Sequence, residues 1–549
     1  MTQGPDGRLT AHRRTRDARR SGGVRAVARL TVRLTRRGAL VMAVAVGAET
    51  AVEAMSYQAA YPDAASRAAL ASFGDDPAIR IMAGVPHAVD TIGGFVNWDA
   101  GWILQVLVAV WALVTAARLL RGDEDTGLAE LVMAGPFRAS RALVSQVLVL
   151  VAECALMGAA VVAALVASGA AWFGAILFGT VIAGFGAVFV GVGAVLAQIL
   201  GSRSRAAGWT AAVLAFSFVL RMVANSADSR AWLGWLTPLG WMDQLHPFGD
   251  NRWPVVAVPV AVTVALVAIA VGLRRRRDTG AGLLTERASR RSNPRLLGSP
   301  IAFAWRTNAG TLVAWTVGLA VWGLTVGLLT RSVVDFVGED EGYRELLASI
   351  GMDTSDVANA YVALVAVVIG VIIALFTAWR IGAARAEEAS SRLEHLVIRP
   401  VLRWRWLGGH VLLTLVSVLG LSAVAAVAMW LGGLVTDADL SAGDAFAAIF
   451  NTVPAVIVFG GLAVLVFGVA PRLTTALSAS IVIVAYVVQL VGPALDWPEL
   501  VLGLSPFHHL EVVPVDPFGT TAAIVMVAIG VLAAGVGMVV FERRDLAGA

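Results

Sequence analysis

Twelve apolar runs, each long enough to cross a lipid bilayer, are the feature of this sequence that most restricts its fold. A helix that spans the hydrocarbon core needs about 20 mostly apolar residues. The runs lie near 38–57, 99–118, 142–168, 171–200, 208–226, 253–273, 309–330, 357–379, 406–432, 446–470, 474–492 and 518–540. Because backbone polar groups in lipid must be satisfied within the protein, these runs predict an all-α polytopic membrane protein with about 12 transmembrane helices.

The composition agrees with lipid as the solvent and removes several kinds of chemistry. Hydrophobic residues make up 58% of the 549 positions and charged residues 15%, which excludes a soluble enzyme. All 42 basic residues are arginine, so the chain lacks the lysine that a phosphate-binding loop or a Schiff base requires. Its single cysteine, Cys154, can form no intrachain disulfide and no cysteine metal cluster. We expect no catalytic residue, no metal site and no cofactor bound by this chain.

The arginines are distributed unevenly between the two sides of the membrane. With a cytoplasmic N-terminus, 35 arginines fall in cytoplasmic segments and six in outer segments, while Arg221 falls within an apolar run. Positive residues accumulate on the cytoplasmic side of membrane proteins. This predicts a multi-pass protein of the bacterial inner (cytoplasmic) membrane with both termini in the cytoplasm.

The two halves of the sequence resemble each other. Three motifs recur: Leu236-Thr237-Pro238 as Leu504-Ser505-Pro506, Pro247-Phe248-Gly249 as Pro517-Phe518-Gly519, and Arg276-Arg277-Asp278 as Arg543-Arg544-Asp545. An even number of helices in each half makes the halves parallel, related by a pseudo-two-fold axis along the membrane normal. We therefore expect two parallel six-helix repeats, with a cavity on the axis between them as the natural place for a substrate.

Four regions follow from the runs and the repeat. Residues 1–37 are expected to form a cytoplasmic arginine-rich arm followed by an amphipathic helix on the anionic inner leaflet. Residues 38–278 are the first six-helix repeat, 279–308 a cytoplasmic linker with an amphipathic segment, and 309–549 the second repeat.

The segment after the second apolar run of each half carries the closest match. The first holds Arg121, Asp123, Glu124, Gly127, Glu130, Pro136 and Arg141, and 264 residues later the second holds Arg385, Glu387, Glu388, Ser391, Glu394, Pro400 and Arg405. Arg121 and Glu124 are three residues apart, which allows an ion pair on one helix face. We expect a short helix parallel to the membrane that ends at Gly135-Pro136. A solvated loop is the alternative, but such a loop needs no particular glutamate spacing.

This pattern resembles the segment after the second helix in permeases of the ABC-2 exporter type. The resemblance continues through Tyr61-Pro62, the Arg221 region, Trp235–Trp241 and His246–Phe248, which are similar to actinobacterial polyketide-antibiotic or multidrug (tetronasin-type) permeases with twelve fused helices. It implies that the matched residues from Arg121 to Arg141 and from Arg385 to Arg405 contact a separate ABC ATPase. Two copies of that subunit would bind ATP and Mg²⁺. Ser391, in place of Gly127, and Arg392 depart from the pattern, so the two segments are expected to contact the ATPase differently.

Polar residues within the apolar runs are the candidates for a substrate pathway, because an ionisable group is costly in lipid. Arg221 lies 17 residues before Pro238, and Gln489 lies 17 before Pro506. With Asn225 they form the candidate pathway. The alternative for Arg221 is a structural role, either snorkelling or pairing with an acidic side chain such as Glu49 or Glu53. His508, His509 and Glu511 are too close together in sequence, without a distant fourth ligand, to predict a metal site.

The sequence thus predicts the membrane-spanning permease subunit of an ATP-driven ABC exporter. Its cargo would be a hydrophobic or amphipathic compound of the antibiotic or multidrug class, and its partners the ATPase subunits and membrane lipid, without nucleic acid. One alternative is a proton-coupled secondary drug exporter, which would show several buried carboxylates and a basic loop after the second helix. Another is an ABC exporter of a lipid or a glycoconjugate.

Overall fold

Helices make up most of the chain that the structure describes. The computed structural model describes residues 5–70, 77–133, 138–278, 282–284, 300–339, 357–389, 403–492 and 497–544. Among these residues there are helices and turns but no strand. Twelve helices are long and apolar enough to cross a membrane, and each overlaps one of the twelve apolar runs. The predicted fold class, an all-α polytopic membrane protein, is confirmed.

The chain divides into two units, Met1–Arg290 and Arg291–Ala549. The helices of the first unit are α1 (Pro5–Ala60), α2 (Ala64–Ala69), α3 (Pro77–Ala83), α4 (Ile92–Asp99), α5 (Gly101–Ala117), η2 (Arg118–Gly122), α6 (Asp123–Asp125), α7 (Leu128–Met133), α8 (Ala139–Ala167), α9 (Trp172–Ile199), α10 (Arg203–Asn225), η3 (Asp228–Leu236), α11 (Pro238–Asp243), η4 (Trp253–Val256) and α12 (Ala257–Arg274). Each unit has an apolar core of its own.

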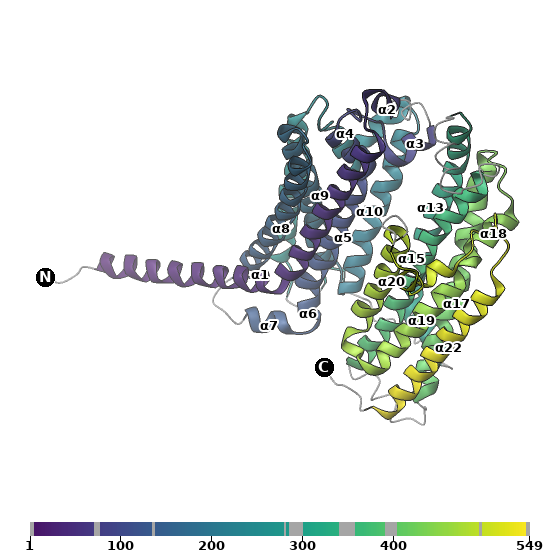
Figure 1. Cartoon of the computed structure of the whole chain (residues 1–549). Coiled ribbons are helices and arrows are strands. Elements are labelled where there is room, and N and C mark those ends of the chain that lie inside the picture. The colour runs from purple at the N-terminus through teal and green to yellow at the C-terminus, as the bar shows by residue number, and fades with distance from the viewer. Residues whose placement is uncertain are drawn as a thin grey trace. The chain divides into compact units, whose positions relative to one another are not determined.

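The first helix is longer than the sequence suggests. It runs without interruption from Pro5 to Ala60, through the position near residue 37 where the sequence predicts that the first membrane segment begins. Every fourth residue from Val27 through Thr31 and Thr35 to Ala39 is buried, and α1 packs against α8. The Thr35 hydroxyl donates to the Thr31 carbonyl at 2.8 Å and meets Glu153 of α8. The N-terminal stretch of α1 projects away from the rest of the unit (Figure 1).

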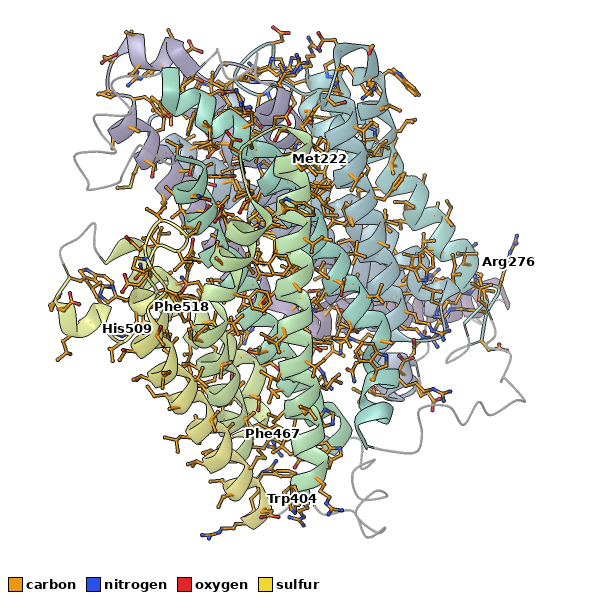
Figure 2. All side chains as sticks on the ribbon, turned by 90° about the vertical axis from the view of Figure 1, so that its right-hand side faces the viewer. Met222, Arg276, Trp404, Phe467, His509 and Phe518 are labelled. Carbon is orange, nitrogen blue, oxygen red and sulfur yellow. The ribbon has the colours of Figure 1, made fainter. Side chains whose placement is uncertain are left out.

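The second unit has the same order of spanning helices as the first, except that one of them is divided in two. It consists of α13 (Pro300–Glu339), α15 (Val357–Ala389), α17 (Arg403–Val435), α18 (Ala442–Asn451), α19 (Val453–Val469), η6 (Pro471–Leu473), α20 (Thr474–Val491), α21 (Glu499–Leu502), η8 (Pro506–His509) and α22 (Thr520–Arg543). The apolar run 446–470 forms two helices, with Pro454 in the first turn of α19, where proline is tolerated. Trp404 and Phe467 lie towards one end of this unit, and His509 and Phe518 lie towards the other (Figure 2).

One repeated motif makes the same contact in both units. The Thr237 hydroxyl donates to the carbonyl of Ser217, 20 residues earlier, at 2.9 Å. The Ser505 hydroxyl donates to the carbonyl of Ala485, also 20 residues earlier, at 2.8 Å. Both hydroxyl-bearing residues are buried. Each bond ties the short helices after the fifth spanning helix back to that helix.

Candidate functional site

The segment after α5 changes helical geometry twice. The α-helix first widens into a π-helical turn, η2 (Arg118–Gly122), a local form that is frequent at functional sites. The chain then forms α6 and, after a turn at Gly127, α7, which departs from the direction of α5 (Figure 1). Gly127 has φ +78° and no atom within 4 Å of the position of a Cβ. The turn therefore needs glycine for its backbone conformation and not for space.

The carboxylate of Glu124 lies among three arginine side chains. Arg277, which follows the end of α12, donates from Nη1 to Oε2 at 2.7 Å and from Nη2 to Oε1 at 2.8 Å. Arg121 Nη1 donates to Oε2 at 3.1 Å, which realises the pair expected from the spacing. Arg274 Nη2 lies 3.2 Å from Oε1. One carboxylate thus joins the end of α5 to the end of α12.

Two further groups contact these side chains, an aspartate and a glutamine. We call Arg121, Glu124, Asp125, Arg274 and Arg277 the first charge cluster. Asp125 accepts from Arg121 Nε at 3.1 Å. Gln198, in the last turn of α9, accepts from Arg277 Nε at 2.9 Å. The Glu124 side chain is 6% exposed and that of Arg277 is 2% exposed. Buried charges persist only when they are paired and hydrogen-bonded, and this cluster meets that condition.

The second unit contains the equivalent cluster. Arg544, the repeat counterpart of Arg277, donates from Nη1 and Nη2 to the two carboxylate oxygens of Glu388 at 2.8 and 2.9 Å. Arg385 lies 3.8 Å from the same carboxylate, which is 1% exposed. The Arg544 guanidinium also lies over the rings of Phe467 and Phe541, at 5.4 and 5.1 Å from the ring centroids. We call Arg385, Glu388 and Arg544 the second charge cluster.

These contacts change the role of two residues matched to the ATPase-contacting segment. Glu124 and Glu388 are buried and bonded to arginines of their own unit, so they are not surface ligands for an ATPase groove. Glu130, by contrast, is exposed on α7, and Leu128 at the start of that helix is 53% exposed. Both side chains on α7 are therefore available to a partner.

The remaining matched residues are placed as follows. Asp123 is half-buried, while Arg141 at the start of α8 and Arg405 at the start of α17 are exposed. Arg405 lies over the Trp404 ring. Pro136, Glu394 and Pro400 lie outside the described residues, as does the side chain of Glu387.

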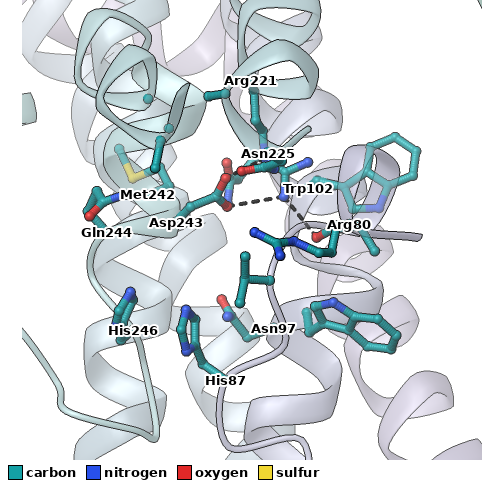
Figure 3. Close-up of a pocket in the computed structure, with 18 of the residues that line it drawn as sticks. Arg80, His87, Asn97, Trp102, Arg221, Asn225, Met242, Asp243, Gln244 and His246 are labelled. Atoms are coloured by element: carbon teal, nitrogen blue, oxygen red, sulfur yellow. Dashed lines mark hydrogen bonds and ion pairs between the residues drawn. The ribbon is translucent and has the colours of Figure 1, made fainter. Parts of the chain in front are cut away.

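Arg221 lies at a small polar cavity within the first unit (Figure 3). Its Nε donates to Asp243 Oδ2 at 2.6 Å, and its Nη2 donates to Asp243 Oδ1 at 3.1 Å and to the Ala83 carbonyl at 2.9 Å. The expectation that its partner is Glu49 or Glu53 is wrong. Proline starts the short helix α11, which turns the chain back and presents Asp243 to α10. The Arg221 side chain is 3% exposed and that of Asp243 is 31% exposed, so the arginine is the buried member of a bidentate ion pair whose carboxylate is partly exposed.

The same arginine fixes the segment between α3 and α4. Gly84 has φ +92°, and a Cβ there would lie 2.8 Å from Arg221 Nη2. The Gly84 carbonyl accepts from Trp98 Nε1 at 2.9 Å, while Arg221 holds the carbonyl before it. Only glycine satisfies both the backbone angle and the close approach to the guanidinium.

Two histidines face the other side of the cavity, as Figure 3 shows. The rings of His87 and His246 are stacked with centroids 3.8 Å apart. Burial lowers the pKa of His87, and burial together with the neighbouring His87 and Arg252 lowers the pKa of His246 to about 4. Both rings are therefore neutral at physiological pH.

The cavity has a volume of about 100 Å³. Pockets for drug-sized ligands measure about 300–1,000 Å³, so this cavity is too small for such a compound. Asn225 lines it, and the Asn225 amide nitrogen has no hydrogen-bond partner within the described part of the chain. Gln489 lies in the second unit on α20. The geometry gives Arg221 a structural contact and leaves the transport pathway a prediction.

Sequence reasoning missed two of the residues that matter most. Asp243 gave no signal, because its pairing depends on a reversal of the chain at α11. Arg277 did give one, since Arg276-Arg277-Asp278 recurs in the second half. Within the described residues, no group of three histidine, cysteine, aspartate or glutamate side chains could hold a metal ion.

Comparison with known proteins identifies a family. The family described as "Multidrug efflux system permease Rv1217c, C-terminal domain" matches residues 26–275 and 297–542. The multidrug efflux system permease protein Rv1217c of Mycobacterium tuberculosis (strain ATCC 25618 / H37Rv) is 31% identical over 497 residues, which cover 89% of this chain and 89% of that protein. The chain belongs to this family of permeases.

Proposed function

We propose that this member of the multidrug efflux permease family is the membrane-spanning subunit of an ATP-driven exporter of the ABC-2 type. It would extrude hydrophobic or amphipathic compounds across the bacterial inner membrane, while two copies of a separate ATPase subunit bind ATP and Mg²⁺. Both termini would be cytoplasmic. The chain itself would carry no catalytic site.

The observation that carries this proposal is the charge cluster that occurs once in each unit. Glu124 ties the segment after α5 to the end of α12 through Arg277, and Glu388 ties the end of α15 to the end of α22 through Arg544. A transporter without an ATPase has no evident need to fasten this segment twice. A segment that receives force from outside the membrane does, because an unfastened segment would deform without moving the helices.

In this mechanism the ATPase grips the exposed face of α7. Leu128 offers an apolar side chain and Glu130 a carboxylate, which together suit a groove with an apolar floor and a basic rim. When the ATPase subunits close on ATP, they would displace α6 and α7. Since Glu124 and Arg277 hold α12 to this segment, α5 and α12 would move together, in the alternating-access manner.

The test separates the gripping residues from the fastening residues. The double variant L128A/E130A should insert normally and keep its thermal stability, but lose association with the ATPase subunit, stimulated ATP hydrolysis and export in reconstituted vesicles. The matched control is D278A, which removes one exposed carboxylate at the end of α12. Normal export by L128A/E130A would overturn the assignment of α7.

The energy source is tested in the same vesicles. Export should require ATP and persist after an ionophore removes the proton gradient. Export that stops with the ionophore and continues without ATP would instead establish the proton-coupled alternative.

A further inference from the structure

A groove on the surface of the first unit, between α1, α8 and α12, differs from both sites described above. Its volume is about 450 Å³. Ala28 of α1, Val144 and Leu148 of α8 and Val271 of α12 contribute to a mostly apolar lining. The residues of α8 that line it extend from Ser140 to Ala152. At 1.5 Å per residue this is about 18 Å, close to the depth of one leaflet of a hydrocarbon core about 30 Å thick.

One end of the groove is strongly positive. Arg141, near the start of α8, and Arg275, after the end of α12, both line it and are exposed. The guanidinium of neither residue makes a hydrogen bond or an ion pair with another described residue. No acidic side chain is among the described residues of the lining. Arg25 and Arg29 of α1, which flank the lining residues Val24 and Ala28, are also exposed.

We propose that this groove binds one anionic phospholipid of the inner leaflet, with its phosphate on Arg141 and Arg275 and an acyl chain along α8. The charge of the rim selects an anion, and the apolar length behind it selects an acyl chain. Basic pockets between transmembrane helices at the cytoplasmic surface are suited to anionic headgroups in this way. The site is independent of ATP and of the cargo, and it assigns Arg141 to lipid instead of to the ATPase.

The second unit offers an internal comparison. The repeat aligns Arg141 with Arg405, but it aligns Arg275 with Glu542. Arg405 lies over the Trp404 ring, and Glu542 is exposed. The second unit therefore has one positive and one negative residue where the first has two positive residues. We expect the anionic lipid site in the first unit only.

The experiment is a lipid titration of the purified, delipidated full chain, followed by native mass spectrometry. Phosphatidylglycerol and phosphatidylcholine with identical acyl chains are compared. R141Q/R275Q should bind phosphatidylglycerol about 30-fold more weakly, since each arginine contributes about 1 kcal/mol and a tenfold change is about 1.4 kcal/mol. Its binding of phosphatidylcholine should fall by much less, because the choline cation offsets the charge of the same phosphate, so the preference for phosphatidylglycerol should be lost. The matched control R405Q/R543Q removes two exposed arginines from the second unit and should keep the preference for phosphatidylglycerol.

A second variant tests the acyl-chain part of the site. A28F fills the apolar floor and should weaken both lipids, while thermal unfolding reports that the protein is folded. Inorganic phosphate at the same concentration should not displace the lipid. The proposal would be overturned if R141Q/R275Q kept the wild-type preference for phosphatidylglycerol, or if R405Q/R543Q lost that preference to the same extent. It would also be overturned if A28F bound lipid as wild type does but exported a different set of compounds. That last result would make the groove a path for cargo.

Discussion

Neutralising Glu124 should destabilise the protein far more than neutralising the arginine that binds it most closely. In E124Q, Arg121, Arg274 and Arg277 keep their buried charges while Asp125 remains the one described carboxylate of the cluster. Breaking a buried ion pair in this way costs about 3–5 kcal/mol. In R277Q the cluster keeps two arginines and two carboxylates, so the loss is limited to the charge-assisted bonds, about 1.5–3 kcal/mol.

Thermal unfolding of the detergent-purified protein measures the difference. The first unit spans Met1–Arg290, so 1 kcal/mol shifts its Tm by about 2 °C, the low end of the range for units of this size. E124Q should therefore melt about 6–10 °C below wild type, and R277Q at a temperature in between. The double variant should be less destabilised than the sum of the two, since the residues share one network. E130Q, which alters an exposed carboxylate of α7, is the control. If E124Q and E130Q have the same Tm, the cluster does not hold the segment after α5 in place.

Three further predictions concern other parts of the first unit and the orientation of the chain. The pKa of His246 is lowered to about 4 from an ordinary 6.5, so keeping this ring neutral stabilises the fold fully above pH 6.5, and that stabilisation is lost as the pH falls towards 4. In H246Q the free energy of unfolding, measured over this pH range, should therefore depend less on pH. G127A should cost about 1–2 kcal/mol, from the left-handed φ alone, and G127N should cost less, both by thermal unfolding. Single cysteines at Ser204 and Ala442, which are exposed, should react with an impermeant reagent from opposite sides, since the native Cys154 is buried; reaction of both from outside would refute the topology.

The spanning helices could be predicted because their cause is local. Each is a run of apolar residues whose length alone satisfies the hydrocarbon core, and no distant contact is needed to recognise it. The residues at which these helices begin and end were less predictable. α1 continues without interruption through residue 37, whereas the run 446–470 is divided at Asn451 and Thr452, with Pro454 in the first turn of the next helix.

The candidate site was only half predictable. The sequence singled out Glu124 and Glu388 through their exact repetition, but repetition cannot distinguish a surface ligand from a buried partner. That distinction depends on where the end of the sixth helix lies, 153 residues after Glu124 and 156 after Glu388. An arginine that recurs once in each half, as the glutamate does, was the signal that could have linked the two motifs.

The two charge clusters also show how a buried network can change and keep its balance. The repeat aligns Arg274 with Phe541 and Asp125 with Ala389, so the second cluster has lost one cation and one anion of the first. Both clusters keep a net charge of +1: three arginines against two carboxylates in the first, and two against one in the second. Replacing a buried ion pair by apolar side chains is often neutral or stabilising, whereas removing one partner is costly. In the first cluster Arg274 pairs with Glu124 and Asp125 pairs with Arg121, so losing both leaves the net charge unchanged. In the second unit the Phe541 ring lies against the Arg544 guanidinium. What both units retain is the bidentate pair between the glutamate and the arginine after the last helix, which is the contact that fastening the segment requires.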